Sequence, residues 1–362
     1  MKKVKKMITA LATSILVLGC NISAFALGFD INNDGVVNVN DVTFLQNEIS
    51  NFNDNTDYDL NNDGRIDVND ISTLQIEISN NDIKTIEANT KLSVTTNEYK
   101  KNVGDTVTFS ITTNNAISDI TYTSSDSSVA KIISTDSNTV KVKVNKVGSA
   151  TVTAKQCSQS VSVRFSVEKA KCIDLSEWNG SIDFNKVKKS GVTCVILRAG
   201  YGKDPNQEDN KFQEYYRQAK SAGLNVGAYW YSYATSVDAA KAEVKNCMNT
   251  IGGKQFDLPV FLDVEEYRQA VLPRRTLTDI ISAFCDGIKS YGYDVGMYSA
   301  KSMLVDSAYP DELSSKYLIW IAAPNTSYSD LPSYVDLWQY SWNGKVDGIR
   351  GDVDLNYIYN LN

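Results

Sequence analysis

The second half of the chain alternates short apolar runs with helical stretches, starting at Lys171. The runs CIDL, CVILRAG, VGAYWYSY, PVFLDVE and VGMYSA are each followed by a stretch with helical spacing. The later runs YLIWIA, DLWQYS and VDLNYI follow one another with only loops between them. Alternating strands and helices are typical of parallel sheets with helical crossovers. The pattern predicts an α/β, irregular TIM-like barrel with five βα units, three further strands and an incomplete helical ring.

Several predicted strands end in polar or aromatic residues, and in such barrels the active site lies at the carboxyl ends of the strands. The acidic candidates are Asp174, Asp263, Glu265 and Asp354. The candidates for substrate binding are Arg198, Tyr201, Tyr229, Tyr231, Tyr298, Trp338, Gln339 and Tyr340. Core packing is an equally good explanation for part of the aromatic set. Because side chains alternate along a strand, Asp263 and Glu265 should share one side, ~7 Å apart at Cα, and Glu266 should point away.

The chain contains no histidine, which excludes several kinds of active site. A Ser-His-Asp triad, a Cys-His pair and a histidine-ligated zinc are all impossible. Carboxylates are therefore the best candidates for acid and base, and crowded carboxylates ringed by Tyr and Trp favour a glycosidase. The formal net charge of −7 argues against nucleic-acid binding and against an electrostatic membrane anchor.

Residues 170–362 resemble glycoside hydrolase family 25, the Chalaropsis-type lysozymes. The resemblance is carried, in family order, by CIDLSEWNGSIDFNKVKKSGVTCVILRAGYG, AKSAGLNVGAYWYSYA, PVFLDVEE, GYDVGMYSA and LWQYSWNGKVDGIRGDVDLN. It implies a muramidase that needs no cofactor and hydrolyses the β-1,4 bond between N-acetylmuramic acid and N-acetylglucosamine in peptidoglycan. The family's D-x-E motif falls on Asp263 and Glu265, with Glu265 as general acid. Its first-strand and last-strand acids fall on Asp174 and Asp354, and Trp230 stands where many members have histidine.

The resemblance leaves the mechanism and two other functions open. Glu265 must be protonated to donate to the leaving oxygen, so its pKa should be raised. Asp263 should stay ionised, either as a nucleophile or to orient the substrate's own N-acetyl group. The alternative functions are a non-catalytic glycan-binding component of a calcium-dependent extracellular assembly, and an enzyme for another N-acetylated glycan such as chitin.

A repeat near the N-terminus predicts calcium binding. DINNDGVVNVNDVTFLQNEIS recurs as DLNNDGRIDVNDISTLQIEIS, and each copy has oxygen ligands at the spacing of a twelve-residue calcium loop, followed by apolar helical spacing. The expected ligands are Asp30, Asn32, Asp34, Val36, Asn38 and Asp41 in one loop and Asp59, Asn61, Asp63, Arg65, Asp67 and Asp70 in the other. Residues 28–84 resemble dockerin domains, which implies two structural Ca²⁺ ions and the cohesin domain of an extracellular scaffold protein as partner.

Residues 85–169 are rich in Thr, Ser and Val and show strand-like alternation, which is typical of a β-sandwich. SSDSSVAKI and VNKVGSATVTAK resemble bacterial Ig-like group 2 domains. No catalytic constellation is visible, so we interpret this region as a spacer.

The N-terminal residues 1–26 have the pattern of a secretory signal peptide, with lysines, an apolar stretch and Ala24-Phe25-Ala26 before the cleavage site. The apolar stretch is too short for a transmembrane helix. A lipoprotein with lipidated Cys20 is a weaker match because Leu18 is bulky. We therefore expect a secreted, extracellular protein without a membrane anchor. Cys157, Cys172, Cys194, Cys247 and Cys285 show no disulfide or metal-binding spacing.

Overall fold

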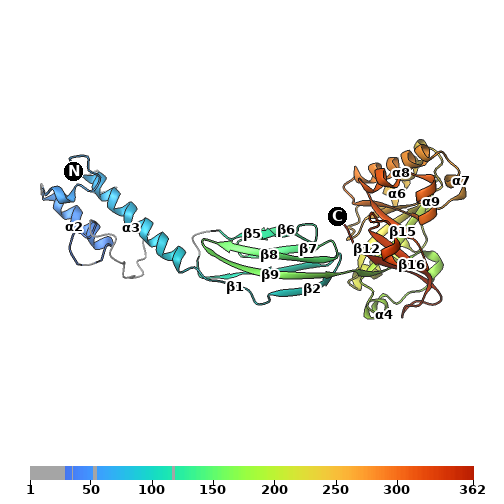
Figure 1. The fold of residues 1–362 in the computed structure, drawn as a ribbon, viewed down its shortest axis with the longest axis horizontal. Coiled ribbons are helices and arrows are strands. Elements are labelled where there is room, and N and C mark those ends of the chain that lie inside the picture. The colour runs from blue at the N-terminus through green and yellow to red at the C-terminus, as the bar shows by residue number, and fades with distance from the viewer. Residues whose placement is uncertain (1–28, 35, 52–54, 116–118) are drawn as a thin grey trace. The chain divides into compact units, whose positions relative to one another are not determined.

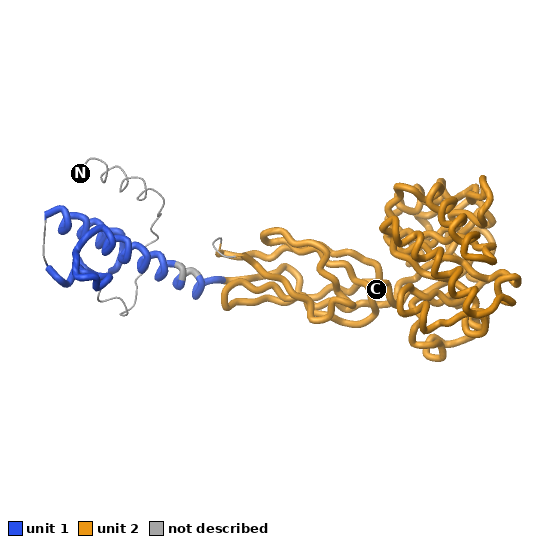
Figure 2. Tube along the Cα trace, turned by 90° about the horizontal axis from the view of Figure 1, so that it is seen from above, with its two compact units in different colours: residues 1–90 blue, residues 91–362 orange. Residues whose placement is uncertain are grey.

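The computed structural model describes residues 29–34, 36–51, 55–115 and 119–362. The chain divides into two compact units, Met1–Thr90 and Lys91–Asn362, which Figure 2 shows in different colours. The expected signal peptide, residues 1–26, lies outside the described residues. Every helix in the described ranges is too short or too polar to cross a membrane.

The first unit consists of two loop–helix repeats that pack through their helices. Helix α2 (Val39–Ser50) and helix α3 (Val68–Ala88) are joined by a segment with a 3-10 turn, η1 (Thr56–Tyr58). Each helix begins in a capping box, formed by Asn38 with Asp41 and by Asp67 with Asp70. The core consists of Ile31, Val37, Val42, Leu45, Ile71, Leu74 and Ile78. The apolar helical spacing in both repeats therefore marks the buried faces, as predicted.

The part of the second unit before the barrel is all-β, as its sequence predicts. A four-stranded sheet has the order β2 (Glu98–Asn102), β9 (Gln159–Glu168), β8 (Gly148–Gln156), β5 (Thr121–Ser124). A three-stranded sheet has the order β3 (Thr106–Ser110), β7 (Thr139–Val144), β6 (Ala130–Asp136), and β1 (Leu92–Ser93) pairs with β4 (Thr112–Thr113). Alternating burial along β3 and β7 places Phe109 and Val142 in one core with Phe165 of β9.

The rest of the second unit is a closed eight-stranded barrel, with its strands in sequence order (Figure 1). The strands are β10 (Ala170–Leu175), β11 (Cys194–Tyr201), β12 (Asn225–Tyr231), β13 (Val260–Asp263), β14 (Val295–Ala300), β15 (Leu318–Ala322), β16 (Leu337–Gly344) and β17 (Val353–Ile358). Neighbours from β10 to β16 run parallel, whereas β17 is antiparallel to both β16 and β10. The sequence predicts eight strands correctly but gives no sign of this reversal.

Helices follow the early strands and stop after β14. They are α4 (Phe184–Lys189), α5 (Phe212–Ser221), α6 (Val237–Ile251), α7 (Tyr267–Ala270), α8 (Arg274–Lys289), α9 (Lys301–Ser307) and α10 (Pro310–Ser314), with 3-10 turns η2 (Glu177–Asn179) and η3 (Tyr328–Asp330). Beyond β15 the described residues contain no α-helix, so the predicted incomplete helical ring is confirmed. Cys172, Cys194, Cys247 and Cys285 are buried core residues, and none of the described cysteines forms a disulfide.

Aromatic rings cover the outer side of the barrel where helices are missing. Tyr340 stacks on Tyr357 with 4.7 Å between ring centroids, and Tyr328 stacks on Tyr359. Trp338 packs against both Tyr328 and Tyr357, and its indole N–H donates to a backbone carbonyl, that of Ala323. These rings bury the outer faces of β16 and β17 in place of a helix.

The all-β region and the barrel contact each other within the second unit. The backbone N–H of Leu361 donates to the carbonyl of Asn145 at 2.7 Å, and that of Val147 donates to the carbonyl of Tyr359 at 2.9 Å. Lys143 Nζ donates to the carbonyl of Asp257, which precedes β13. The contact is thus at the amino ends of the strands, opposite the end at which Asp174, Asp263 and Asp354 lie.

Candidate active site

Four acidic residues meet at one end of the barrel. Asp174 lies directly opposite Asp354 in the antiparallel pairing of β10 and β17. Asp263 is the last residue of β13, flanked by Tyr231 of β12 and Tyr298 of β14. Glu265 follows two residues later, outside the strand, and its carboxyl group is close enough to raise the pKa of Asp263. The acids that the sequence singled out are therefore one cluster.

A hydrogen-bond network fixes the carboxyl group of Asp174. Its Oδ2 accepts from Gln339 Nε2 at 3.0 Å and from Asn356 Nδ2 at 2.8 Å. Tyr298 donates to Gln339 Oε1, and Trp320 donates to Asn356 Oδ1. Because every member is buried and paired, the network holds Asp174 in one orientation.

Burial raises the pKa of all four acids. Asp354, which is also hydrogen-bonded to Asp174, has its pKa raised to about 8 by burial and by the charge of Asp174. Burial raises the pKa of Asp263 well above its usual value, and Glu265 and Asp174 add to the effect. Burial likewise raises the pKa of Asp174 and of Glu265. Burial therefore favours the protonated form of each acid, and Asp354 keeps its proton at neutral pH.

The protonation of Asp263 differs from the prediction. We expected this residue to stay ionised, but burial and two neighbouring acids favour its neutral form when no substrate is bound. Arg198 acts in the opposite direction and lowers the pKa of Asp263. Asp263 Oδ1 is buried and has no hydrogen-bond partner among the described residues. This oxygen is free to receive a donor from a ligand.

Arg198 is held by two acids that the sequence did not single out. Its Nε donates to Asp209 Oδ2 at 2.7 Å, and its NH2 group donates to Glu177 Oε1 at 2.8 Å. Asp209 also accepts from the backbone N–H of Glu177 at 3.0 Å. Arg198 therefore supplies a fixed positive charge next to Asp263, and no spacing rule in the sequence joins it to Glu177 or Asp209.

The tyrosines of β11 and β12 form a wall beside the acids. The half-buried ring of Tyr229 faces Asp174, Asp263 and Arg198, which all act on its pKa. Tyr231 donates to Glu266 Oε1 at 2.7 Å, and the same hydroxyl also faces Glu265. Tyr233 packs against Tyr231 at 5.1 Å and edge-to-face against Tyr201.

The expected orientation of Glu266 is wrong. Strand β13 ends at Asp263, so the alternation of side chains does not continue to residue 266. Glu266 instead receives the hydroxyl of Tyr231 beside Glu265 and begins helix α7. It belongs to the edge of the site.

The structure does not bring two predicted substrate-binding residues to the acids. Trp338 and Tyr340 lie on the outer side of β16, in the aromatic cluster with Tyr357. Only Gln339 between them points inward, where it bonds Asp174. Trp230, which stands where many members of the resembled family have histidine, is a buried core residue that donates to the carbonyl of Gly202.

Sequence reasoning missed Asn356 and Trp320, although one signal could have found Asn356. Asn356 is two residues beyond Asp354 on the same strand and therefore points to the same side.

Exposed aromatic residues also flank the site. Trp178 follows Glu177, Tyr267 follows Glu266, and Trp342 donates its N–H to Gln339 Oε1 at 2.7 Å.

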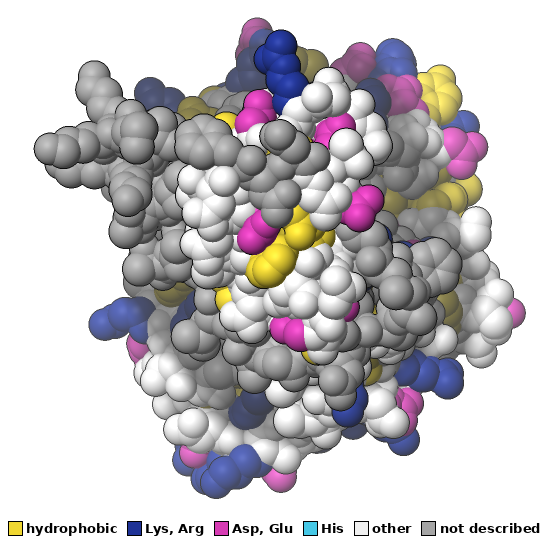
Figure 3. All heavy atoms as spheres, turned by 90° about the vertical axis from the view of Figure 1, so that its left-hand side faces the viewer, with side chains coloured by type: hydrophobic (Ala, Val, Ile, Leu, Met, Phe, Trp, Pro, Cys, Tyr) yellow, Lys and Arg dark blue, Asp and Glu magenta, His cyan; other side chains and the backbone are white. Residues whose placement is uncertain are grey.

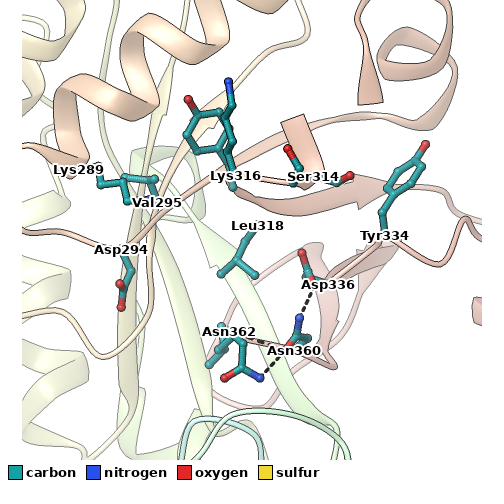
Figure 4. Close-up of a pocket in the computed structure, with 13 residues that line it drawn as sticks. Lys289, Asp294, Val295, Ser314, Lys316, Leu318, Tyr334, Asp336, Asn360 and Asn362 are labelled. Atoms are coloured by element: carbon teal, nitrogen blue, oxygen red, sulfur yellow. Dashed lines mark hydrogen bonds between the residues drawn. The ribbon is translucent and has the colours of Figure 1, made fainter. Parts of the chain in front are cut away.

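A cavity of about 330 Å³ lies away from the acids. Its lining includes Asp294 and Val295 at the start of β14, Leu318 at the start of β15, and Asn360 (Figure 4). Asn360 donates to Asp336 there, at 2.6 Å. This cavity is at the amino ends of the strands and contains none of the acids of the candidate site.

The loops of the first unit suit a hard cation such as Ca²⁺. In the second loop Asp70, fully buried, accepts the backbone N–H groups of Leu60 and Asp67, and Asp59 accepts those of Asp63 and Gly64. Asp41 holds Asn32 and Asn38 in the same way in the first loop. The described residues contain no cluster of three His, Cys, Asp or Glu side chains in ligating positions. Amide and backbone oxygens would therefore have to complete each site.

Two family models match the chain. Residues 173–349 match glycosyl hydrolases family 25, and residues 28–79 match the dockerin type I domain. An autolytic lysozyme of Clostridium acetobutylicum is 32% identical over 189 residues, which cover 51% of this chain and 55% of that protein. The uncharacterized protein YegX of Escherichia coli O157:H7 is 30% identical over 192 residues, which cover 51% of this chain and 67% of that protein.

Among solved structures, the bacterial lysozyme from Streptomyces coelicolor is similar, with 29% identity and a TM-score of 0.48. The match covers 53% of this chain and 92% of that one. The chain spans little more than half the length of the autolytic lysozyme, and 67% of that of YegX. By its barrel the chain belongs to glycosyl hydrolases family 25, and part of its first unit matches the dockerin type I domain.

Proposed function

We propose that the protein is a secreted peptidoglycan muramidase, which cleaves the β-1,4 bond between N-acetylmuramic acid and N-acetylglucosamine. The observation that supports this function most directly is the cluster of Asp174, Asp263, Glu265 and Asp354 at the mouth of a family 25 barrel. The similarity to an autolytic lysozyme supports the same substrate class. No step of the proposed reaction requires a metal.

Glu265 is the proposed general acid. Burial raises the pKa of Glu265, and Asp174 and Glu266 raise it further, which favours the protonated form that a general acid needs. Its position outside the regular strand, next to the Tyr231 hydroxyl, leaves it exposed and reachable by a ligand.

Asp263 is proposed to stabilise, as a carboxylate, the positive charge that develops on the sugar. The transition state of glycoside hydrolysis resembles an oxocarbenium ion, and a positive charge nearby lowers the pKa of a carboxyl group. A positively charged sugar therefore favours the ionised form of Asp263, whose proton passes to solvent before the bond breaks. Its unpaired Oδ1 suits either attack on the sugar or acceptance of the N–H of the substrate's acetamido group.

The decisive experiment is hydrolysis of purified peptidoglycan with identification of the new reducing-end sugar. N-acetylmuramic acid at the new end is the expected product. Glu265→Gln cannot donate a labile proton and should lower the rate roughly 10²–10⁴-fold, with an unchanged melting temperature. Asp263→Asn should also be severe. Binding without cleavage would favour the non-catalytic alternative, and cleavage of chitin alone would favour the other glycan.

The other regions are proposed to place this activity outside the cell. Residues 28–84 would bind two Ca²⁺ ions and dock to a cohesin on an extracellular scaffold, as the dockerin match suggests. The first unit exposes Val39, Val68 and Ile76, and Figure 3 shows a small apolar patch among acidic side chains on the face that it draws. Residues 85–169 would form a bacterial Ig-like group 2 domain, and residues 170–362 the catalytic domain.

A further inference from the structure

A buried carboxylate lies behind the candidate site, and the hydrogen bonds described for it go to residues other than the four acids. Glu243 of helix α6 is fully buried, as are Ser232 and Gln269. Ser232 follows the end of β12, and Gln269 belongs to the short helix α7. Three buried polar side chains from three elements meet here, at the back of the segment that carries Glu265.

The hydrogen bonds of these three residues form one connected chain. Glu243 Oε2 accepts from the Ser232 hydroxyl at 2.7 Å, and Glu243 Oε1 accepts from the backbone N–H of Tyr233 at 2.8 Å. Ser232 Oγ accepts in turn from Gln269 Nε2 at 3.1 Å. Gln269 Oε1 accepts from the backbone N–H of Glu266 at 3.3 Å. The chain thus runs from helix α6 to the residue next to Glu265.

The donors and acceptors in this chain are fully matched. The Ser232 hydroxyl has one proton, which goes to Glu243, and its oxygen accepts from Gln269 and from the backbone N–H of Ala234. The second N–H of the Gln269 amide donates to the carbonyl of Ala234 at 3.1 Å. Both side-chain oxygens of Glu243 accept a hydrogen bond. In Glu243→Gln the amide NH2 group would replace one of these acceptors and would meet a hydrogen-bond donor, either the Ser232 hydroxyl or the Tyr233 N–H.

The segment needs such support because it has no regular structure of its own. Residues 264–266 follow β13 and precede α7, outside any strand or helix. Val264 donates to the carbonyl of Tyr298, and Ser232 donates its N–H to the carbonyl of Asp263. Beyond these strand-end bonds, the backbone N–H of Glu266 donates to Gln269 Oε1, and its carbonyl accepts from the backbone N–H groups of Gln269 and Ala270.

We propose that Glu243 is a positioning residue, which holds Glu265 in place through Ser232, Gln269 and the backbone of Glu266. The role in catalysis rests on the proposed muramidase function. Glu243 does not contact the substrate; it fixes the turn after β12 and the turn before α7 against each other. A displacement of about 1 Å in a catalytic group can lower a rate up to about 10²-fold.

Three substitutions test the chain, namely Glu243→Gln, Ser232→Ala and Gln269→Ala, with Asp238→Asn as control. Asp238 is an exposed carboxylate on the same helix, so the control makes the same chemical change without touching the chain. We expect kcat on peptidoglycan to fall tenfold or more in each test variant while KM changes less than threefold. Asp238→Asn should match the wild type in both.

A double variant separates positioning from simple loss of stability. If Glu243 acts through Gln269, the double variant Glu243→Gln with Gln269→Ala should have a kcat no lower than that of the worse single variant. The reason is that both substitutions interrupt the same series of hydrogen bonds. Independent structural damage would instead multiply the two losses. Wild-type kcat in both Glu243→Gln and Ser232→Ala would overturn the proposal.

A measurement without substrate keeps this inference apart from the proposed function. Amide hydrogen exchange of residues 263–270 should be at least tenfold faster in Glu243→Gln than in the wild type and in Asp238→Asn. If the wild type does not cleave peptidoglycan, the muramidase function fails while this exchange result still supports the positioning role. Unchanged exchange would overturn it even in an active enzyme.

Discussion

Two carboxyl groups that face each other inside a protein tend to share one proton, and Asp354 and Asp174 are such a pair. Asp174 accepts two amide donors, which stabilise its charged form, whereas burial and the charge of Asp174 raise the pKa of Asp354 to about 8. The pair therefore keeps its proton on Asp354 at neutral pH. Asp354 is then a hydrogen-bond donor to Asp174 and carries no charge of its own.

This assignment predicts how stability depends on pH. The pKa of Asp354 rises from 3.8 when unfolded to about 8 when folded, so between these values the folded state keeps a proton that the unfolded state loses. The contribution to stability is full below pH 4 and is lost as the pH rises to 8. Denaturant titrations from pH 5 to 8 should show a smaller fall in unfolding free energy for Asp354→Asn than for the wild type. Equal slopes would contradict the assignment.

Single residues also show what the sequence could and could not predict. The alternation of side chains along a strand correctly predicted that Asp263 points into the site. Applied to β16, the same rule predicts that Gln339 points inward and that Trp338 and Tyr340 point outward. It failed for Glu266 because β13 ends three residues earlier. Glu243 could not be found at all, since its role depends on which residues of other elements meet helix α6.

The paired loop–helix elements of the first unit combine two tasks at one position. Asp41 and Asp70 close the capping boxes of α2 and α3 and are also the expected last calcium ligands. Both side chains are fully buried, and burial raises the pKa of Asp41, as do Asp30 and Asp34. A bound cation would offset the unfavourable free energy of burying this negative charge, because it would neutralise the carboxylate and its acidic neighbours.

We therefore expect calcium to stabilise the first unit and not the reaction. Calorimetry should detect binding of two Ca²⁺ ions, and metal should raise the melting temperature of this unit. Asp70→Asn keeps the size of the side chain but removes a charge, and should abolish one of the two binding events. Chelation should leave peptidoglycan hydrolysis by the barrel unchanged. Absence of any calcium binding would remove the metal-loop interpretation.

The order of elements was more predictable than their direction. Apolar runs and helical spacing gave the eight barrel strands and the loss of helices after β14, because both depend on local patterns. The reversal of β17 depends on a loop of only eight residues between Gly344 and Val353, which returns the chain beside β16 without a crossover. The sequence alone shows this loop, but it does not show which strand β17 will pair with.

Within the second unit, the all-β region packs against the barrel. A simple spacer, as we interpreted residues 85–169 from the sequence, would not need such a contact. Residues 359–361 exchange backbone hydrogen bonds with residues 145–147, so the segment after β17 extends the contact made by Lys143. Gly104 lies close against this contact, because a Cβ atom added to it would be 3.2 Å from Asn225 Nδ2 and 3.6 Å from Leu361 Cδ1. The all-β region therefore supports the amino ends of the barrel strands.

Breaking this contact should uncouple the two parts. Leu361→Asp places an unpaired charge among Gly104, Leu258 and Asn225, which costs at least ~2 kcal/mol and should lower the melting temperature by roughly 4 °C or more. Scanning calorimetry of the wild type should show one transition for residues 91–362, and the variant should show two. Leu361→Met keeps an apolar side chain and is the control. Two independent transitions already in the wild type would mean that the all-β region is only a spacer.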